Sequence, residues 1–228
     1  RPPESGMPVQ HPSIPRPKAV VFDWDNTLVD SWGTIHAALE VTFTAMGHVP
    51  WTLEETRDRV RYSMRESFPK LFGDDWERAA EIFYGAFERL HLERLAPTSG
   101  ASEMLSMFHD AGLCLAVVSN KTGRYLREEA AHLDWDRYFH NIVGAGDAPR
   151  DKPAEDPVHM ALAGSEVSVG PDVWFVGDAD VDMEIAHRTN CIPVLLRHDQ
   201  PAGDEFEDIQ PRVHFRSCIE LASHVITL

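Results

Sequence analysis

Residues 19–28 read AVVFDWDNTL and join four apolar residues directly to a cluster of acidic ones. A short continuous apolar run of this kind predicts a strand that is buried on both faces of a parallel sheet. Polar residues after such a strand lie at the carboxyl edge of the sheet, where open α/β sheets bind their ligands. This stretch therefore sets the first strand and the place to search for a site.

The same pattern of an apolar run followed by polar or glycine-containing residues recurs along the chain. Further strands are predicted at residues 113–118, 173–176 and 192–196, with a weaker one at 142–143. Apolar residues at three- and four-residue spacing predict helices between them, over residues 101–110, 124–132, 157–163 and 180–189. Alternating strands and helices predict an α/β fold with a Rossmann-like parallel sheet and helices on both faces.

Residues 31–97 interrupt this alternation, because they contain amphipathic helical segments and no convincing strand. The clearest segments are IHAALEVTFTAM, LEETRDRVRYSM and WERAAEIFYGAFERLHLERL, separated by the turn-rich stretches GHVPW and FPKLFGDD. An insertion of this size predicts a small helical cap domain over 31–97, hinged near residues 30–33 and 96–100. The sheet domain is then expected over 18–30 and 98–228.

The composition of the chain limits its partners and location. With 37 acidic and 21 basic residues, the formal net charge is −16, which disfavours nucleic acid and anionic membranes as partners. No apolar run approaches the roughly 20 residues of a membrane span, and the three cysteines lack paired metal-type spacing. A soluble cytoplasmic protein, monomeric or homodimeric, is expected. Residues 1–17 contain six prolines and are expected to form an extended surface arm.

Chemically capable side chains follow each predicted strand. They are Asp23, Asp25 and Thr27, then Ser119 and Asn120, then Asp151 and Lys152, and finally Asp178 and Asp182. Carboxylates that converge repel one another unless a hard cation lies among them, and Mg²⁺ prefers oxygen ligands while it keeps a substrate phosphate. Asp23 and Asp178 are the expected direct Mg²⁺ ligands. Lys152 and the hydroxyl of Ser119 are expected to hold phosphate oxygens, so the set predicts phosphoryl transfer.

In this order, FDWDNTLVD, VVSN, DKP and FVGDADVD resemble the four motifs of the haloacid dehalogenase-like (HAD) hydrolase superfamily. The similarity extends from residue 18 to about residue 196, and the helical insertion resembles the family's type 1 cap. Within the superfamily the chain most resembles phosphoglycolate phosphatase-like proteins. The resemblance implies that Asp23 attacks phosphorus to form an aspartyl-phosphate. It also implies that Asp25 acts as general acid and base, while its backbone carbonyl binds Mg²⁺.

The resemblance implies supporting roles for the other motif residues. Phosphate binding is assigned to Trp24 and Asp25 through their backbone N–H groups, and to Ser119, Asn120 and Lys152. Thr27 and Asp182 are assigned to the surroundings of the metal, where Asp182 orients its water shell. The ring of Trp24 is expected to shape the wall of the cavity.

The substrate is left open by the sequence. A small-molecule phosphate monoester is expected, with 2-phosphoglycolate, sugar phosphates and nucleoside monophosphates as candidates. A phosphomutase would keep all four motifs, whereas Asp25 argues against a dehalogenase, because haloacid dehalogenases lack the second aspartate. Arg57, Arg61 and Arg65 are spaced four residues apart on one predicted helix face. They either present a cation to a second anionic group of the substrate or form a solvated face.

Overall fold

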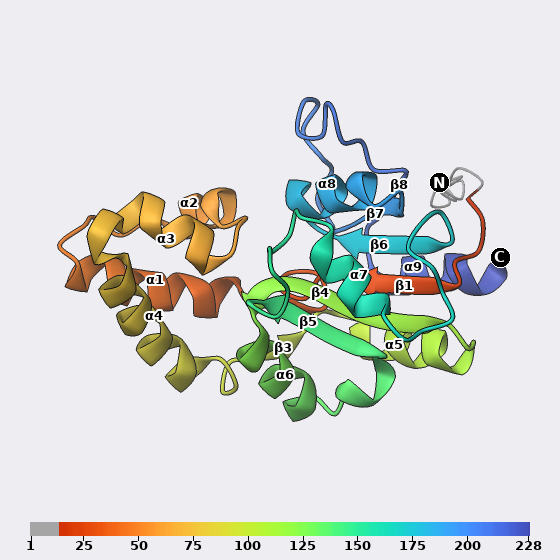
Figure 1. The fold of residues 1–228 in the computed structure, drawn as a ribbon, viewed down its shortest axis with the longest axis horizontal. Coiled ribbons are helices and arrows are strands. Elements are labelled where there is room, and N and C mark those ends of the chain that lie inside the picture. Colours follow the sequence, from red (N-terminus) through yellow and green to blue (C-terminus); the bar gives the residue numbers. More distant parts are fainter. Residues whose placement is uncertain (1–13) are drawn as a thin grey trace, which may run out of the picture.

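The computed structural model describes residues 14–228, so the expected extended course of residues 1–13 lies outside the described residues. At the centre is a six-stranded parallel sheet with the order β5-β4-β1-β6-β7-β8 (Figure 1). Its strands are β1 (Ala19–Phe22), β4 (Cys114–Thr122), β5 (Asn141–Ala145), β6 (Val173–Gly177), β7 (Ile192–Leu196) and β8 (Val213–Phe215). The predicted α/β class is confirmed, and β8 is a strand that the sequence did not indicate.

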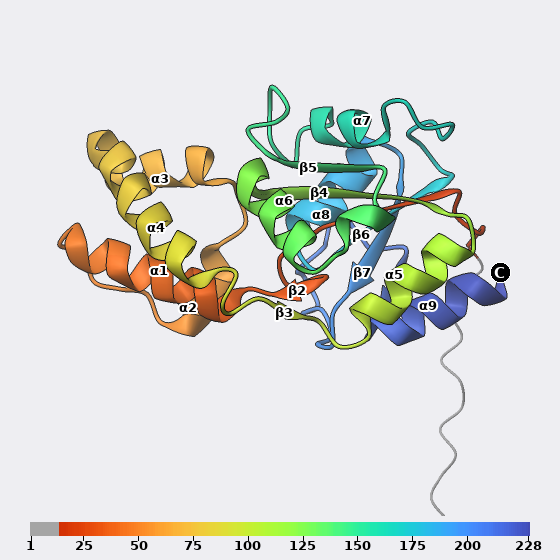
Figure 2. The same ribbon diagram turned by 90° about the horizontal axis from the view of Figure 1, so that it is seen from below.

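Helices cover both faces of this sheet. One face carries α5 (Ala101–Asp110), α6 (Gly123–His132) and α9 (Cys218–Thr227), and the other carries α7 (Asp156–Leu162) and α8 (Asp180–Arg188). A short 3₁₀ turn, η2 (Asp136–Tyr138), precedes β5. Figure 2 shows α5 and α9 side by side at one face, with α7 on the opposite side.

Strand β1 is buried on both faces because its side chains alternate between them. Val20 and Phe22 join the apolar cluster beneath α5, α6 and α9, whereas Ala19 and Val21 join the cluster beneath α7 and α8. All four side chains are fully buried. The strand pairs with β4 on one side and β6 on the other, so the acidic cluster that follows it lies at the middle of the carboxyl edge.

Residues 32–90 form a separate group of helices beyond that edge (Figure 1). We call this group the helical unit: α1 (Trp32–Ala45), α2 (Leu53–Arg59), α3 (Met64–Phe72), the 3₁₀ turn η1 (Gly73–Asp75) and α4 (Trp76–Leu90). It has an apolar cluster of its own, in which aromatic rings of α1, α3 and α4 pack together. Where the chain enters and leaves the unit, β2 (Val29–Asp30) and β3 (Ala96–Pro97) pair antiparallel.

The helical unit differs from the sequence prediction at one place. The segment LEETRDRVRYSM was expected to be one helix, but α2 ends at Arg59 and Val60 has an extended backbone conformation, with φ −82° and ψ 98°. The next helix, α3, includes the FPKLF stretch that was expected to be a turn. Phe68 and Phe72 are buried in the apolar cluster of the unit, and this packing favours the helix despite Pro69 inside it.

The break between α2 and α3 separates the three arginines that were expected on one helix face. Arg57 lies in α2, Arg61 in the connecting loop and Arg65 in α3. The expectation of a shared face is therefore wrong.

Ile14, the first residue that the structure describes, is buried in the apolar cluster beneath α5, α6 and α9. Within residues 14–228, no helix has the length and apolar character needed to cross a bilayer.

Candidate active site

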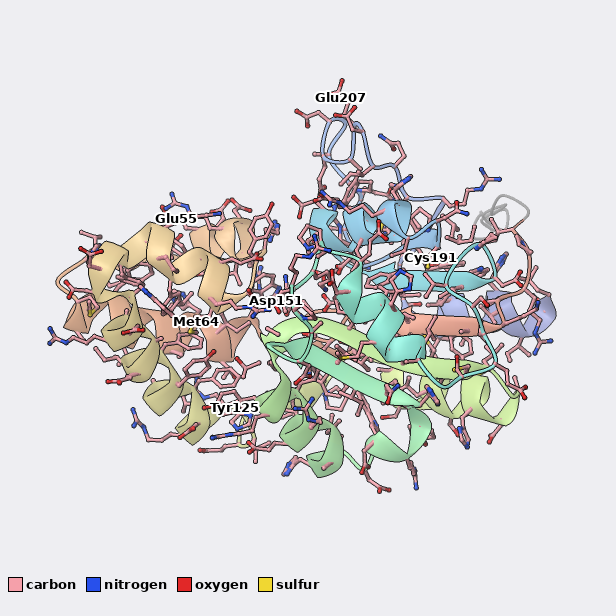
Figure 3. All side chains as sticks on the ribbon, viewed as in Figure 1. Glu55, Met64, Tyr125, Asp151, Cys191 and Glu207 are labelled. Carbon is pink, nitrogen blue, oxygen red and sulfur yellow. The ribbon has the colours of Figure 1, made fainter. Side chains whose placement is uncertain are left out.

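The carboxyl end of β4 and the loops that follow β1, β5 and β6 meet in one cavity between the sheet and the helical unit. Its volume is about 170 Å³. The lining includes Asp23, Asp25, Ser119, Asn120, Lys152 and Asp178. Figure 3 shows the junction where the cavity lies, with Asp151 on the sheet side and Met64 of α3 facing it. The neighbouring positions of β4, β1 and β6 in the sheet explain why residues more than 150 positions apart in the sequence meet here.

Lys152 is a buried cation that contacts two carboxylates. Its Nζ lies 2.9 Å from Asp23 Oδ1 and 2.6 Å from Asp182 Oδ1, and its side chain is 2% exposed. Burial lowers the pKa of Lys152, but the charges of Asp182 and Asp23 outweigh burial and hold this pKa above its ordinary value. Lys152 is therefore charged at neutral pH and lies directly beside Asp23.

Three carboxylates form a cluster that suits a hard cation. Asp23, Asp178 and Asp182 each place one oxygen within 4.8 Å of the others. Burial and the charge of Asp182 raise the pKa of Asp23 well above its ordinary value, and the same causes raise the pKa of Asp178 to about 7. One lysine does not neutralise three acids, so a divalent cation with oxygen ligands fits this donor set.

Asp182 is held by the protein more tightly than the other two acids. Its Oδ2 accepts the backbone N–H groups of Asp178 at 3.0 Å and Ala179 at 3.1 Å, and its Oδ1 faces Lys152. Asp178 Oδ1 accepts the hydroxyl of Thr27 at 3.2 Å. This arrangement leaves Asp23 and Asp178 as the side chains suited to hold an ion, with Asp182 and Thr27 fixing the loop around them.

Asp25 has a basic partner that the sequence reasoning missed. Lys121 Nζ lies 2.6 Å from Asp25 Oδ1, and the hydroxyl of Ser31 donates to the same oxygen. The turn after Asp25 is closed by Asn26, which has a φ of 62° and accepts the N–H of Ser31 at 3.2 Å. Asparagine tolerates this left-handed conformation. Lys121 directly follows Asn120, so its position at the carboxyl end of β4 (Cys114–Thr122) was the available signal.

Glu129 of α6 extends this contact into a buried network. Its Oε2 lies 2.7 Å from Lys121 Nζ and accepts the indole N–H of Trp24 at 2.7 Å. Its Oε1 lies 3.0 Å from Nδ1 of His91, at the end of α4. Burial raises the pKa of Glu129, but the hydrogen bond with His91 and the charge of Lys121 bring it below its ordinary value. The network therefore links Asp25 to the helical unit.

The ring of Trp24 lies elsewhere than expected, whereas Asn120 lines the cavity. The ring of Trp24 is fully buried in the core and packs edge-on against Trp135 with 5.7 Å between centroids, so the expectation that it shapes the cavity wall is wrong. Its backbone N–H donates to Asp23 Oδ1 at 2.7 Å. The Asn120 amide donates to the carbonyl oxygen of Lys152 at 3.0 Å, while Ser119 Oγ accepts the N–H of Lys121 at 3.1 Å.

Two of the three arginines connect the helical unit to the sheet loops. Arg65 Nε and Nη2 each lie 2.5 Å from an oxygen of Asp151, which is buried and directly precedes Lys152. Burial raises the pKa of Asp151, but the hydrogen bond from Arg65 contributes to a net decrease. Arg61 Nε lies 3.5 Å from Asp180 Oδ1. Arg57 is exposed. Among residues 14–228, no hydrogen bond or ion pair joins its side chain to the sheet loops.

Comparison with known proteins agrees with this geometry. The family model for haloacid dehalogenase-like hydrolases matches residues 20–195. A phosphoglycolate phosphatase of Pseudomonas fluorescens is 29% identical over 227 residues, which cover 92% of this chain and 82% of that protein. One of Shigella boydii is 26% identical over 231 residues, with 90% of each chain covered.

Solved structures show the same fold. A predicted phosphoglycolate phosphatase from Haemophilus somnus superposes with a TM-score of 0.81 at 19% identity, covering 95% of this chain and 100% of that chain. A haloacid dehalogenase-like hydrolase from Streptococcus pneumoniae gives a TM-score of 0.79 at 20% identity, covering 92% and 98%. The family match and the curated relatives identify the chain as a phosphatase. The chain thus belongs to the haloacid dehalogenase-like hydrolases.

Proposed function

We propose that this phosphatase is a Mg²⁺-dependent phosphomonoester hydrolase that acts through an aspartyl-phosphate on Asp23. The observation that carries the proposal is the position of Asp23, whose carboxylate lies 2.9 Å from the Lys152 ammonium within the acidic cluster. Lys152 offsets the charge of an incoming phosphate, so the negative nucleophile can approach a negative substrate. Mg²⁺, held by Asp23, Asp178 and the carbonyl of Asp25, would supply further neutralisation of that charge.

Each residue of the site has its own role in the proposed reaction. Asp23 attacks phosphorus, and the bond from phosphorus to the leaving oxygen breaks. Asp25 gives its proton to the leaving alkoxide and then takes a proton from the water that hydrolyses the aspartyl-phosphate. Ser119 and Lys152 hold the phosphoryl oxygens, and backbone N–H groups near Trp24, together with Asn120 at the carboxyl end of β4, complete the phosphate site.

We also propose that the helical unit acts as a cap domain. The boundaries are those expected from the sequence, with the cap over 31–97 and the catalytic core over 18–30 and 98–228. The cavity between the unit and the sheet supports this proposal, as does the paired β2–β3 crossing. A cap in this place would exclude water from the site during the first step.

The relatives named phosphoglycolate phosphatase support 2-phosphoglycolate as one candidate substrate. Sugar phosphates, nucleoside monophosphates and the phosphomutase reaction remain alternatives on the same scaffold. A phosphomutase would accumulate a stable phospho-enzyme and require a bisphosphate activator. A phosphatase would release inorganic phosphate without one.

The test is hydrolysis of an aryl phosphate with Mg²⁺ and with a chelator, followed by trapping of the phospho-enzyme. Wild-type protein should turn over only with the metal, and Asp23→Asn should form no covalent adduct. Glu207→Gln is the matched control, because Glu207 lies on an exposed loop away from the cavity (Figure 3). Metal-independent turnover, or an adduct on Asp23→Asn, would contradict the proposal.

A further inference from the structure

The cavity has two walls of different chemistry. The sheet wall carries the acids and Lys152 described above. The wall from the helical unit is mostly apolar, with aliphatic and aromatic side chains that include Ile35, Leu39, Phe68, Leu71, Phe83 and Phe87. It also contains Arg59, Arg61, Tyr62, Ser67 and Tyr84. Leu39, Phe68, Phe83 and Phe87 are buried in the apolar cluster of the unit. A leaving group attached to a phosphate at Asp23 would point from the polar wall toward this apolar wall.

Each cation that lines the cavity among residues 14–228 already faces a carboxylate. Four such cations line it, and their partners are as follows: Arg59 faces Glu55 at 3.0 Å, Arg61 faces Asp180 at 3.5 Å, Lys121 faces Asp25 at 2.6 Å, and Lys152 faces Asp23 at 2.9 Å. Lys152 is committed to the phosphate. A second anionic group on the substrate would have to share Arg59, Arg61 or Lys121 with the carboxylate that already offsets its charge.

The size of the cavity suits a compact apolar group. An apolar protein cavity of about 150 Å³ can hold a benzene ring. This cavity measures about 170 Å³ and must also hold the phosphoryl group beside Asp23, so the leaving group can be no larger than a single ring. An apolar ring would pack against the apolar side chains of this wall and would bring no polar group that needs a partner. A carboxylate placed there would lose its hydration and gain no free cation, which disfavours its binding.

We propose that the substrate is a phosphate monoester of an apolar, ring-sized alcohol rather than of a carboxylate-bearing alcohol such as glycolate. The inference rests on the proposed phosphatase function. Asp23 forms a bond to phosphorus as the phosphorus–oxygen bond to the alcohol breaks, and the alcohol leaves with the proton of Asp25. Water then hydrolyses the aspartyl-phosphate, which yields inorganic phosphate and returns a proton to Asp25.

The test compares kcat/KM for benzyl phosphate, 2-phosphoglycolate and glucose 6-phosphate with Mg²⁺. All three release primary alkoxides, so differences report binding of the leaving group more than its intrinsic reactivity. Benzyl phosphate should exceed each of the others by about tenfold or more, the effect expected of contacts in an apolar pocket. A preference for 2-phosphoglycolate or glucose 6-phosphate would overturn the substrate class and leave the phosphatase function intact. No hydrolysis of these three esters or of the aryl phosphate would instead contradict the proposed phosphomonoester hydrolase function.

Variants of the apolar wall give a second measurement that does not depend on how much protein folds. The ratio of kcat/KM for benzyl phosphate to that for methyl phosphate reports only active molecules. Leu71→Ala should lower this ratio about tenfold, and Leu71→Met should retain it. Val41→Ala, on the exposed face of α1, is the matched control and should leave it unchanged. A ratio that stays at the wild-type value in Leu71→Ala would overturn the proposal.

A cation introduced into the apolar wall should change the substrate preference in the opposite direction. Leu71→Arg adds a cation without an existing carboxylate partner, so it should shift preference from benzyl phosphate toward 2-phosphoglycolate. Arg59→Gln removes the most exposed of the four cations, with 52% side-chain exposure. It should leave the low rate with 2-phosphoglycolate unchanged. A selective loss of 2-phosphoglycolate turnover in Arg59→Gln would show that Arg59 binds the substrate carboxylate, contrary to the proposal.

Discussion

Lys121 holds Asp25 through a contact of 2.6 Å between Nζ and Oδ1, inside the junction of the sheet and the helical unit. Burial lowers the pKa of Lys121, but the charges of Asp25 and Glu129 outweigh it and raise the pKa above its ordinary value. Lys121 is therefore a fixed cation that orients the proposed general acid. Its side chain is 6% exposed, so the contact is sheltered from solvent screening.

Replacing Lys121 with methionine should separate its effects on catalysis and stability. We expect kcat to fall by about 10²-fold, since a small displacement of a catalytic group has effects of this size. The free energy of unfolding should fall by about 3–5 kcal/mol, because Glu129 loses its charge partner inside the protein. The double variant Lys121→Met/Glu129→Gln should regain stability but not kcat. Wild-type kcat in the single variant would show that Asp25 needs no such support.

Asp25→Asn tests the proton transfer itself. We expect kcat for an alkyl phosphate to fall by about 10²–10⁴-fold, with KM nearly unchanged, because only the transition state needs the proton. An aryl phosphate should lose less in the phosphorylation step, since its leaving group needs less protonation. Single-turnover release of the two alcohols measures this difference. Equal losses for both esters would exclude Asp25 as the acid that protonates the leaving group.

Gly177→Ala should disturb the site through Asp182. A Cβ atom at position 177 would collide with the Asp182 carboxyl group, which binds Lys152 and the backbone of the Asp178 loop. Overpacking of this kind costs about 1–3 kcal/mol of stability, and kcat/KM should fall as Lys152 shifts. Gly33→Ala is the matched control, because a Cβ there meets nothing within 4 Å. Thermal unfolding and steady-state kinetics on both variants check the prediction.

Arg65→Gln and Arg57→Gln form a pair that separates a bridging arginine from an exposed one. Loss of Arg65 leaves the buried carboxylate of Asp151 without its bidentate partner, at a cost of about 1–3 kcal/mol. Because Asp151 directly precedes Lys152, KM for the phosphate ester should rise as well. Arg57→Gln should change neither stability nor KM. Equal behaviour of the two variants would show that the bridge has no effect on the lysine loop.

The stability of the metal-free protein should decrease as the pH rises from about 5 to 7. The pKa of Asp178 is about 7 in the folded protein against an ordinary value of 3.8. The folded state therefore holds the extra proton in this range, and its stability falls as the proton is lost. The raised pKa of Asp23 acts in the same direction. Denaturant unfolding with a chelator measures the slope.

Bound Mg²⁺ should flatten this dependence, because the ion neutralises the carboxylates that otherwise repel one another. Asp178→Asn should reduce the slope in the absence of metal, since the amide does not titrate. Glu207→Gln, on the remote loop, should keep the full slope. A metal-free protein that becomes more stable across this range would contradict the charge balance described for the cluster.

Local pattern was sufficient to predict the framework of the sheet. Apolar runs of four to six residues are typical of strands buried on both faces, and the four strands predicted in this way are present. The weaker strand predicted at 142–143 is present as β5. Because the pattern at 142–143 is weak, the third motif, DKP, was recognised mainly by its resemblance to the family motif. Strand β8 and helix α9 were not predicted. VHF is short, whereas the buried residues of α9, Cys218, Leu221, Ala222 and Val225, follow a helical spacing that the sequence does contain.

The residues that the sequence did not indicate depend on tertiary contacts. Lys121 contacts Asp25 because β4 lies beside β1 in the sheet. Glu129 contacts Lys121 because α6 directs its side chain into the protein. Helix α3, which replaces an expected turn, has the same origin, because Phe68 and Phe72 pack against Phe83 of α4 and Phe43 of α1. A helical periodicity does not predict which distant residues a helix contacts. Motifs that follow strands do predict contacts with one another, because the carboxyl ends of parallel strands lie at one edge of the sheet.

Both passages of the chain between the sheet and the helical unit run through the β2–β3 pair, in which Val29 lies opposite Pro97 and Asp30 opposite Ala96. Two strands that are bonded to each other cannot move independently, so we expect the two passages to bend as one ribbon. We therefore expect the proposed cap to move relative to the sheet as one body about this pair. Admission of the ester and release of the alcohol would then depend on the same motion.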